Sequence, residues 1–378
     1  MHQQDENSLW VGTRNGLNLL DLSDGTTQSF LVSDDEKAQF SSSSIINIEP
    51  GQDDQLWLNT RDGILRFDTK TGNTYPLKVD SAEDDAILKS EIFDVFTTSG
   101  GVLLLMLDAG FFRYSPDTGK VIKIEQLSAS IDPRNAVGFI KGVKPNTTLI
   151  SAYGQLWEMQ DATAQVTLIH TTPLQQLKSK IYPNDALIDA NNIMWIAYSG
   201  YGLVGIDALT YEKKFFYNKE NLLPNNIIFD MQPDTNGNIW LGSNSGLIKF
   251  SPQEHHIQKF DHEQGLAISE LNSDTSLTLL DGRMVYGSPK GLIFFDPLKV
   301  SLEKPNDISV AITNIILVSN DLAMPFSNLD GQSIELTHED VGLSIHFSTL
   351  EYQNQKSTRY EYQLSGKKRL NLPYYNAS

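Results

Sequence analysis

The chain has 378 residues, with 29 Lys and Arg against 47 Asp and Glu, a formal net charge of -18 and 40% apolar residues. This acidity argues against a DNA- or RNA-binding protein, because nucleic-acid affinity depends mainly on Lys and Arg that neutralise phosphates. The absence of cysteine excludes disulfides, zinc-thiolate sites, iron-sulfur clusters and a cysteine nucleophile. Because a single core usually stops growing near about 250 to 300 residues, we expect one large domain and one small one.

The sequence shows no targeting or membrane-spanning segment. It contains no run of about 18 apolar residues, the length that a spanning helix needs. The first residues, Met1–Glu6, are polar and resemble neither a signal peptide nor an amphipathic targeting sequence. If the protein is exported or anchored, we expect the responsible segments to lie outside this chain.

A short motif recurs along the chain, with Trp shortly before a turn that ends in Gly-Leu or Gly-Ile. Four copies keep the tryptophan, and three weaker copies carry an aliphatic residue instead. The equivalent positions are Trp10, Trp57, Leu104, Ile150, Trp195, Trp240 and Val285. Their spacings are 47, 47, 46, 45, 45 and 45 residues. Seven evenly spaced copies predict a repeat architecture.

Each repeat is predicted to form four short strands, because its apolar residues alternate and its turns carry Gly, Asn and Asp. In the sixth repeat the expected strands are 226–232, 239–242, 246–250 and 256–260, with a tight turn at 234–238. Four strands in about 45 residues, repeated radially, are typical of a β-propeller blade. We therefore predict an all-β chain with a seven-bladed β-propeller over residues 1–300, in which tryptophans pack between neighbouring blades.

The two ends of the propeller are predicted to be incomplete. No apolar strand precedes Trp10, so blade one is expected to lack its inner strand. No outer strand is evident after Phe295, so blade seven is expected to lack its outer one. These gaps indicate a piece of a longer chain with upstream residues missing.

After Pro305 the repeat stops, and the segments 308–317, 342–347 and 359–364 alternate like the strands of a β-sandwich. The remaining length is short of the roughly 100 residues that an immunoglobulin-like sandwich needs. We predict that residues 306–378 form a truncated immunoglobulin-like β-sandwich.

The repeat resembles that of a known family. Its Leu-Trp-x-Gly-Thr-x-x-Gly-Leu pattern, followed by Phe-Asp and a Thr-Gly turn as in 67–72, is similar to the two-component regulator propeller repeat. The segments 343–352 and 359–366 resemble the start of the triple-tyrosine immunoglobulin-like domain that follows those propellers. Together the two resemblances cover nearly the whole chain.

The resemblance implies the periplasmic sensor region of a bacterial inner-membrane receptor. In that family the immunoglobulin-like domain leads to a transmembrane helix and then to a cytoplasmic histidine kinase or diguanylate cyclase. Family members often carry two propellers, whereas one is visible here, and 367–378 replaces the strands expected after Gly366. The kind of output domain therefore cannot be read from this chain.

Several motifs have simpler structural interpretations. The 200–205 segment matches GxGxxG, but a dinucleotide site needs that loop between a strand and a helix, and here it joins two strands. The 234–238 segment resembles the start of a calcium loop, but no Glu closes the loop at its twelfth position, so we expect a hairpin turn. His255 and His256 are adjacent strand residues that point to opposite faces, so we expect surface histidines. We therefore predict no metal, cofactor or catalytic site.

A ligand is expected at the propeller mouth, where the turn between strands two and three of each blade emerges. The candidate ligand-binding residues of these turns are Arg14, Arg61, Tyr153, Tyr198, Tyr201, Asn244 and Lys290. Cations from blades one, two and seven would form a basic arc, and tyrosines from blades four and five an aromatic arc. Such a rim would suit an acidic oligosaccharide. The simpler interpretation is that these polar turns are only solvated.

Two classes of function remain open. The first is a non-enzymatic sensor that binds a small molecule or oligosaccharide. Such a sensor could also form a homodimer through the C-terminal domain. The second is a propeller-scaffold enzyme, such as a lyase like the streptogramin-degrading propellers, which use a histidine and magnesium. None of the seven histidines falls in the turns between strands two and three, which favours the sensor. A pure protein-interaction scaffold would need a large apolar rim patch, which the sequence does not show.

Overall fold

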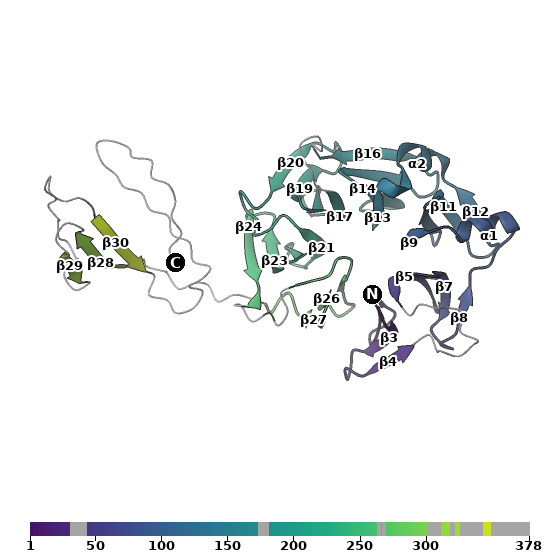
Figure 1. Cartoon of the computed structure of the whole chain (residues 1–378), viewed down its shortest axis with the longest axis horizontal. Coiled ribbons are helices and arrows are strands. Elements are labelled where there is room, and N and C mark those ends of the chain that lie inside the picture. Colours follow the sequence, from purple (N-terminus) through teal and green to yellow (C-terminus); the bar gives the residue numbers. More distant parts are fainter. Residues whose placement is uncertain are drawn as a thin grey trace. The chain divides into compact units, whose positions relative to one another are not determined.

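The computed structural model describes residues 1–30, 44–172, 181–262, 266, 270–300, 311–317, 322–325 and 343–348. The chain divides into two compact units, Met1–Ser301 and Leu302–Ser378. In the first unit seven β-sheets follow one another around a ring, which Figure 1 shows face-on. The chain thus forms the predicted seven-bladed β-propeller.

Each blade is an antiparallel meander whose strands run from the inner to the outer edge in chain order. Blades one to three contain β1 (His2–Gln3), β2 (Ser8–Thr13), β3 (Gly16–Asp21), β4 (Thr27–Phe30), β5 (Ile45–Pro50), β6 (Gln55–Thr60), β7 (Gly63–Asp68), β8 (Thr74–Pro76), β9 (Ile92–Thr97), β10 (Leu103–Leu107), β11 (Gly110–Ser115) and β12 (Lys120–Lys123). Blades four and five contain β13 (Ala136–Lys141), β14 (Thr147–Ala152), β15 (Gln155–Gln160), β16 (Val166–Thr171), β17 (Tyr182–Ile188), β18 (Ile193–Ser199), β19 (Gly202–Asp207) and β20 (Lys213–Tyr217).

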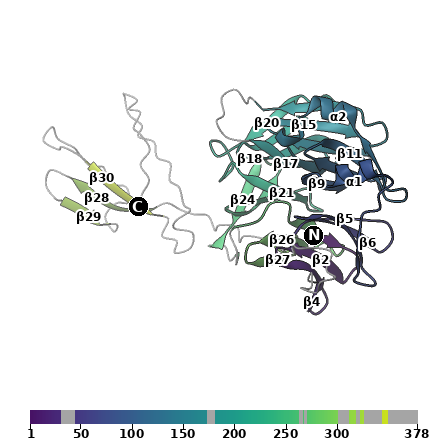
Figure 2. The same ribbon diagram turned by 45° about the vertical axis from the view of Figure 1, so that its right-hand side comes forward.

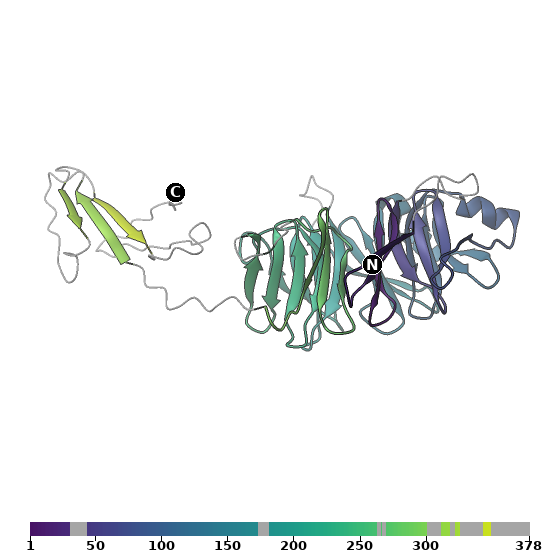
Figure 3. The same ribbon diagram turned by 90° about the horizontal axis from the view of Figure 1, so that it is seen from below.

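Blade six contains the four predicted strands, β21 (Ile228–Pro233), β22 (Ile239–Ser243), β23 (Gly246–Ser251) and β24 (His256–Phe260). Blade seven contains β25 (Ser276–Thr278), β26 (Met284–Ser288) and β27 (Gly291–Phe295), so three strands are present among the residues described there. The oblique view of Figure 2 shows the sheets packed face to face around the ring. Figure 3 shows the strands from the side, with the connecting loops gathered at the two ends of the propeller.

In most blades the second strand is the most deeply buried element, because neighbouring blades cover both of its faces. Every residue of β10, β14 and β22 is buried. The turn after this strand follows from the repeat itself. A Thr or Ser hydroxyl at the strand end donates to the carbonyl of the glycine three residues on, as in Thr60 to Gly63 (2.8 Å) and Ser243 to Gly246 (2.8 Å). Both glycines have positive φ, 139° and 106°, which explains why the motif needs glycine there.

The repeat tryptophans lie between blades, as predicted. Trp195 is 1% exposed, and its ring meets the edge of Phe250 from the next blade at 4.9 Å between centroids. Trp240 is fully buried and lies 4.8 Å from Phe295 of blade seven. The aliphatic residues at the other equivalent positions, Leu104, Ile150 and Val285, are also fully buried. The apolar core is therefore divided into layers between the blades.

The ring closes between blades seven and one through a separate apolar cluster centred on Leu9, Leu279 and Val285. The prediction that blade one lacks an inner strand is wrong. The two residues of β1 pair with β2, His2 opposite Trp10 and Gln3 opposite Leu9. The Gln3 side chain also accepts the Leu280 N–H of blade seven at 2.8 Å. Because this strand is short and polar, it carries no hydrophobic alternation from which it could be recognised.

Two short helices, not predicted from the sequence, occur in links between blades. α1 (Ala82–Leu88) precedes β9, and its first turn is capped by the Ser81 hydroxyl, which accepts the Asp84 N–H at 3.1 Å. α2 (Glu125–Ser130) and a single 3-10 turn, η1 (Pro133–Asn135), precede β13. Both α-helices are shorter than two turns, so the propeller remains a β-structure.

The second unit contains a three-stranded sheet in which β28 (Ala311–Leu317) lies between β29 (Leu322–Pro325) and β30 (Leu343–Ser348). The first and second predicted sandwich strands overlap β28 and β30, and the third, 359–364, lies outside the described residues. No helix in the described part of the chain is both long and apolar enough to cross a membrane.

Candidate functional site

Six of the seven predicted ligand-binding residues occupy turns at one end of the propeller, and Tyr198 lies within a strand. In every blade the second strand runs in the same direction and the third strand returns antiparallel to it. The seven turns that join second to third strands therefore emerge at one end of the propeller. Four candidate side chains are exposed there: Arg14, Arg61, Asn244 and Lys290. Tyr153 is half-buried, with its ring 6.0 Å from that of Tyr182 at the start of the next inner strand.

Two of the three tyrosines predicted to form an aromatic arc are held away from the mouth. Tyr198 is fully buried near the end of β18, and its hydroxyl lies 2.5 Å from Nδ1 of His170 on the outer strand of blade four. The Tyr201 ring packs against Phe216 of the outer strand β20, 4.6 Å between centroids. Tyr198 is therefore a packing residue between blades four and five. Its assignment to the rim is wrong, because Tyr198 lies within β18, which continues to Ser199, and not in the turn that follows.

Below the mouth, the inner strands enclose a central cavity of about 460 Å³. Residues from β5, β9, β13, β17, β21 and β25 line it, together with Met1 and the segment that leads into β25. Five of the lining residues are acidic: Glu49, Asp94, Asp185, Asp230 and Asp274. Lys141 is the one Lys or Arg among the described residues of the lining. The channel is thus acidic, whereas the rim above it carries the predicted cations.

Three of these carboxylates join neighbouring blades. Asp94 accepts the Val95 N–H of its own strand at 2.8 Å and the Phe139 N–H of blade four at 2.7 Å. Asp185 likewise accepts the N–H groups of Ala186 and, in blade six, Met231, both at 2.7 Å. The same position in these blades therefore ties one inner strand to the next. We call Asp94, Asp185 and Asp230 the inner-strand carboxylates.

Asp230 makes the corresponding link from blade six to blade seven. Its two carboxylate oxygens accept the N–H groups of Asp274 at 2.8 Å and Thr275 at 3.4 Å. In blade two the equivalent residue is Asn47, which accepts the Ile48 N–H at 2.7 Å and donates to the Val95 carbonyl at 3.0 Å. An amide at this position can thus also link two blades, by donating a hydrogen bond to a carbonyl where a carboxylate accepts one from an N–H group.

Burial raises the pKa of the channel carboxyl groups. The pKa of Asp94 rises to about 8 and that of Asp185 to about 7, although their backbone hydrogen bonds favour the charged form. Burial also raises the pKa of Glu49 to about 7, against hydrogen bonds from Thr97 and Asn47. The pKa of Asp230 lies well above its ordinary value through burial and through the nearby carboxylates. Within the described residues, no three acidic or histidine side chains are arranged to hold a metal ion.

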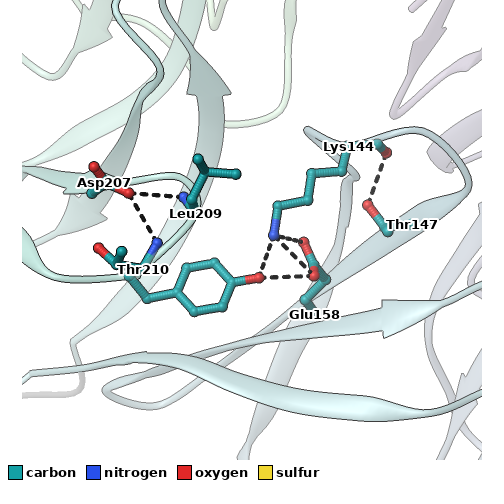
Figure 4. A network of polar contacts seen from close by, with 7 residues as sticks. Lys144, Thr147, Glu158, Asp207, Leu209 and Thr210 are labelled. Carbon is teal, nitrogen blue, oxygen red and sulfur yellow. Dashed lines mark hydrogen bonds and ion pairs between the residues drawn. The ribbon is translucent and has the colours of Figure 1, made fainter.

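A second polar contact between blades involves Lys144 and Glu158, which Figure 4 shows side by side. It lies at the end of the propeller away from the mouth, at the hairpin between β13 and β14. Lys144, from the hairpin between β13 and β14, places Nζ 3.3 Å from both carboxylate oxygens of Glu158 on β15. Tyr211, from the turn before β20, donates its hydroxyl to Glu158 at 3.0 Å and also contacts the Lys144 ammonium. Burial opposes the charged form of Lys144, but Tyr211 and Glu158 together hold its pKa above the usual value. This cluster links blades four and five.

The other sequence motifs have structural roles. The Asp234 carboxylate accepts the N–H groups of Asn236 and Asn238 and the indole N–H of Trp240, which confirms the predicted hairpin turn. The glycine-rich 200–205 segment joins β18 to β19, as predicted. His255 and His256 are both exposed, as predicted, but His255 is not a strand residue, because β24 begins at His256. Nδ1 of His255 lies 2.6 Å from the Tyr217 hydroxyl.

The sequence reasoning missed the acidic channel. The available signal was the recurrence of an acid at one inner-strand position, in Phe93-Asp94-Val95, Asn184-Asp185-Ala186 and Phe229-Asp230-Met231. Asp185 and Asp230 are 45 residues apart, which is the repeat length. The search for a site considered the turns alone, because loops usually carry function.

Comparison with known proteins identifies one repeat directly. Residues 222–245, which include β22 and the turn before it, match the family described as two component regulator propeller. The chain is 26% identical over 148 residues to Histidine kinase P4 of Formosa agariphila. That match covers 37% of this chain and 11% of the kinase, so the chain spans a small part of this relative's length.

Two solved structures have the same fold. One is the extracellular domain of a protein assigned as a hybrid two component system of B. thetaiotaomicron, with a TM-score of 0.66, 21% identity, and coverage of 92% of this chain and 45% of that one. The other is virginiamycin B lyase from Staphylococcus aureus, with a TM-score of 0.55, 12% identity, and coverage of 78% of this chain and 92% of the lyase. At these identities the likeness concerns the fold.

Proposed function

We propose that this chain is the extracytoplasmic ligand-sensing region of a membrane-bound bacterial signalling receptor. The observation that carries the proposal is the match of residues 222–245 to the two component regulator propeller, in a blade whose pattern recurs seven times around the ring. The similarity to Histidine kinase P4 and the shared fold with the extracellular domain from B. thetaiotaomicron support it. The output domain of the whole protein would be a histidine kinase or a diguanylate cyclase.

The ligand is proposed to bind at the mouth of the propeller. Lys290, Arg14 and Arg61 come from three successive blades, seven, one and two, because ring closure makes blade seven adjacent to blade one. Asn244 and Tyr153 add an amide and a half-buried ring at the same end. Guanidinium groups bind carboxylate or sulfate through paired hydrogen bonds, and a tyrosine ring can stack on a sugar. A small acidic molecule or an acidic oligosaccharide is the ligand class that fits these groups.

The second unit is proposed to pass the event toward the membrane. Its three-stranded sheet, β29-β28-β30, is consistent with the beginning of the triple-tyrosine immunoglobulin-like domain. A homodimer formed through this unit would bring two output domains together. Analytical ultracentrifugation of the 378-residue chain and of residues 1–301 would separate a dimer that depends on the second unit from one that does not.

Calorimetry tests the ligand proposal. A panel of acidic and neutral oligosaccharides is titrated into the wild-type chain, Arg61→Ala and Arg283→Ala. Arg283 is the matched control, because it pairs with Asp281 in the hairpin before β26, at the end of the propeller away from the mouth. Loss of a charged hydrogen bond in Arg61→Ala should weaken binding by about 10- to 150-fold, equivalent to about 1.5 to 3 kcal/mol. Equal affinities of all three proteins for the best ligand would contradict the proposed site.

The alternative function is a lyase on the same scaffold, which the shared fold with virginiamycin B lyase favours. The two proposals differ in what happens to the bound ligand. A sensor releases its ligand unchanged, whereas a lyase converts it. Mass spectrometry of the oligosaccharide panel and of a streptogramin, after incubation with the protein and magnesium, should show no product for a sensor. Turnover that a single rim substitution abolishes would establish the enzyme instead.

A further inference from the structure

The inner-strand carboxylates combine two conditions that oppose each other. Each of them uses both oxygens to accept backbone N–H groups, at least one of them from the adjacent blade, and such hydrogen bonds favour the anion. Yet all three line one cavity of about 460 Å³, together with Glu49 and Asp274. Buried like charges around a shared cavity disfavour ionisation. Closing the ring therefore places carboxyl groups where their protonation differs from that in the unfolded chain.

We propose that closure of the propeller is proton-linked, with the inner-strand carboxylates and Glu49 taking up protons as the blades assemble around the channel. Release of these protons would then place several like charges around one cavity, and their repulsion would destabilise the closed ring. The proposal goes beyond ligand sensing and does not depend on it. It stands on the position of these groups at the blade junctions and around the cavity.

The charged and titratable groups that face the channel come from every inner strand. β9 supplies Asp94, β17 Asp185, β21 Asp230, β5 Glu49, and the segment before β25 Asp274. The opposing groups are few: Lys141 lies at the end of β13, Met1 lines the cavity just before β1, and His2 lies in β1. Burial lowers the pKa of both the Met1 amine and His2 and so opposes their charged forms. Tyr286 on β26 is buried close to Asp230 and Asp185, which raise its pKa further.

The direction of the pH effect follows from the pKa values. In the folded protein they are about 8 for Asp94 and about 7 for Asp185 and Glu49, against about 4 for such groups in an unfolded chain. Between these limits the folded chain keeps protons that the unfolded chain has lost. Stability should therefore be higher at acidic pH, decrease from about pH 4 to pH 8, and become constant above pH 8 with respect to these groups.

The experiment is unfolding of the 378-residue chain as a function of pH. All five tryptophans lie in the first unit, so tryptophan fluorescence follows the propeller alone. Between pH 5.5 and 8.5 the melting temperature of the wild type should fall by about 5 °C or more. The slope of unfolding free energy against pH should correspond to at least about one extra proton on the folded chain.

Two variants identify the groups responsible, Asp94→Asn and Asp185→Asn. Asn is a suitable replacement because Asn47 occupies the equivalent position in blade two and bonds to blade three. Each variant should reduce the slope by about one proton. Glu220→Gln is the matched control, since it also removes one carboxylate but at an exposed position, and it should leave the slope unchanged.

Two results would overturn the proposal. One is a wild-type melting temperature that is constant or rises from pH 5.5 to 8.5. The other is an equal slope in Asp94→Asn, Asp185→Asn and Glu220→Gln. If the Asn variants do not fold, carbon-13 NMR of the carboxyl groups in the wild type decides the question. Channel carboxyls that titrate above about pH 6 would support proton uptake, and titration of all of them near pH 4 would refute it.

Discussion

Substitution of Trp240 by alanine should remove a large part of the packing between blades six and seven. The indole is fully buried and stacks on Phe260 of its own blade at 5.4 Å, while Phe295 of the next blade lies 4.8 Å away. Its N–H donates to Asp234 at 3.2 Å. Loss of a fully buried tryptophan typically costs about 3 to 5 kcal/mol, because the lost contacts are accompanied by a residual cavity. We expect a loss of this size in the free energy of unfolding.

Urea unfolding followed by far-UV circular dichroism measures this loss, and two further variants identify its source. Trp240→Phe keeps much of the ring but removes the bond to Asp234, so its loss should be about 1 to 2 kcal/mol. Trp157→Ala is the matched control: this tryptophan is half-buried on β15 and bonds to Gln155 of its own strand at 3.1 Å. It should cost less than Trp240→Ala. A Trp240→Ala midpoint equal to that of the wild type or of Trp157→Ala would refute packing between blades as the basis of stability.

Three further predictions follow from the contacts described above. Lys144→Met should destabilise the propeller by about 1 to 3 kcal/mol, because it leaves the buried Glu158 carboxylate without its cation, and Glu158→Gln in the same background should recover part of this loss in urea unfolding. Tyr198→Phe should lower the free energy of unfolding by about 1 kcal/mol through loss of the contact with His170. A decrease in ligand affinity, measured by calorimetry, would show instead that Tyr198 contributes to ligand binding. Amides of β28 and β30 should exchange with deuterium faster than those of β18 and β22, and equal protection by mass spectrometry would contradict a less stable second unit.

The number of blades could be predicted because the tryptophan motif reports packing that every blade repeats. Trp57, Trp195 and their aliphatic equivalents occupy equivalent buried positions in successive blades, so the spacing of 45 to 47 residues survives where the tryptophan does not. β1 could not be recognised, since it consists of His2 and Gln3 and is held by pairing with β2. α1 carried a signal that was not used: Ser81 followed by Glu83, Asp84 and Asp85 is the composition of a helix start.

The candidate site was predicted in part. A turn is formed by residues that are close in the sequence, whereas the channel is lined by residues from many blades. Arg14, Arg61 and Lys290 could be placed at one end from strand order alone. Tyr198 was misplaced because it lies within β18, which continues to Ser199, and the repeat spacing does not fix the residue at which a strand ends. The acidity of the channel arises from residues more than 40 positions apart, and their burial depends on closure of the whole ring.

Closure also explains why the acidic groups and the basic groups are separated in this propeller. Gly138 occupies the inner-strand position of blade four, and a Cβ atom there would lie 3.0 Å from Oδ2 of Asp94. The carboxylate of blade three thus fills the space that a side chain of blade four would need, so the two residues depend on each other. Because the junctions use carboxyl groups in this way, acidic side chains are built into the channel, whereas the cations Arg14, Arg61 and Lys290 lie at the rim. An anionic ligand attracted by those cations would be repelled by the ionised part of the channel and kept at the mouth, where the links between blades can respond to it.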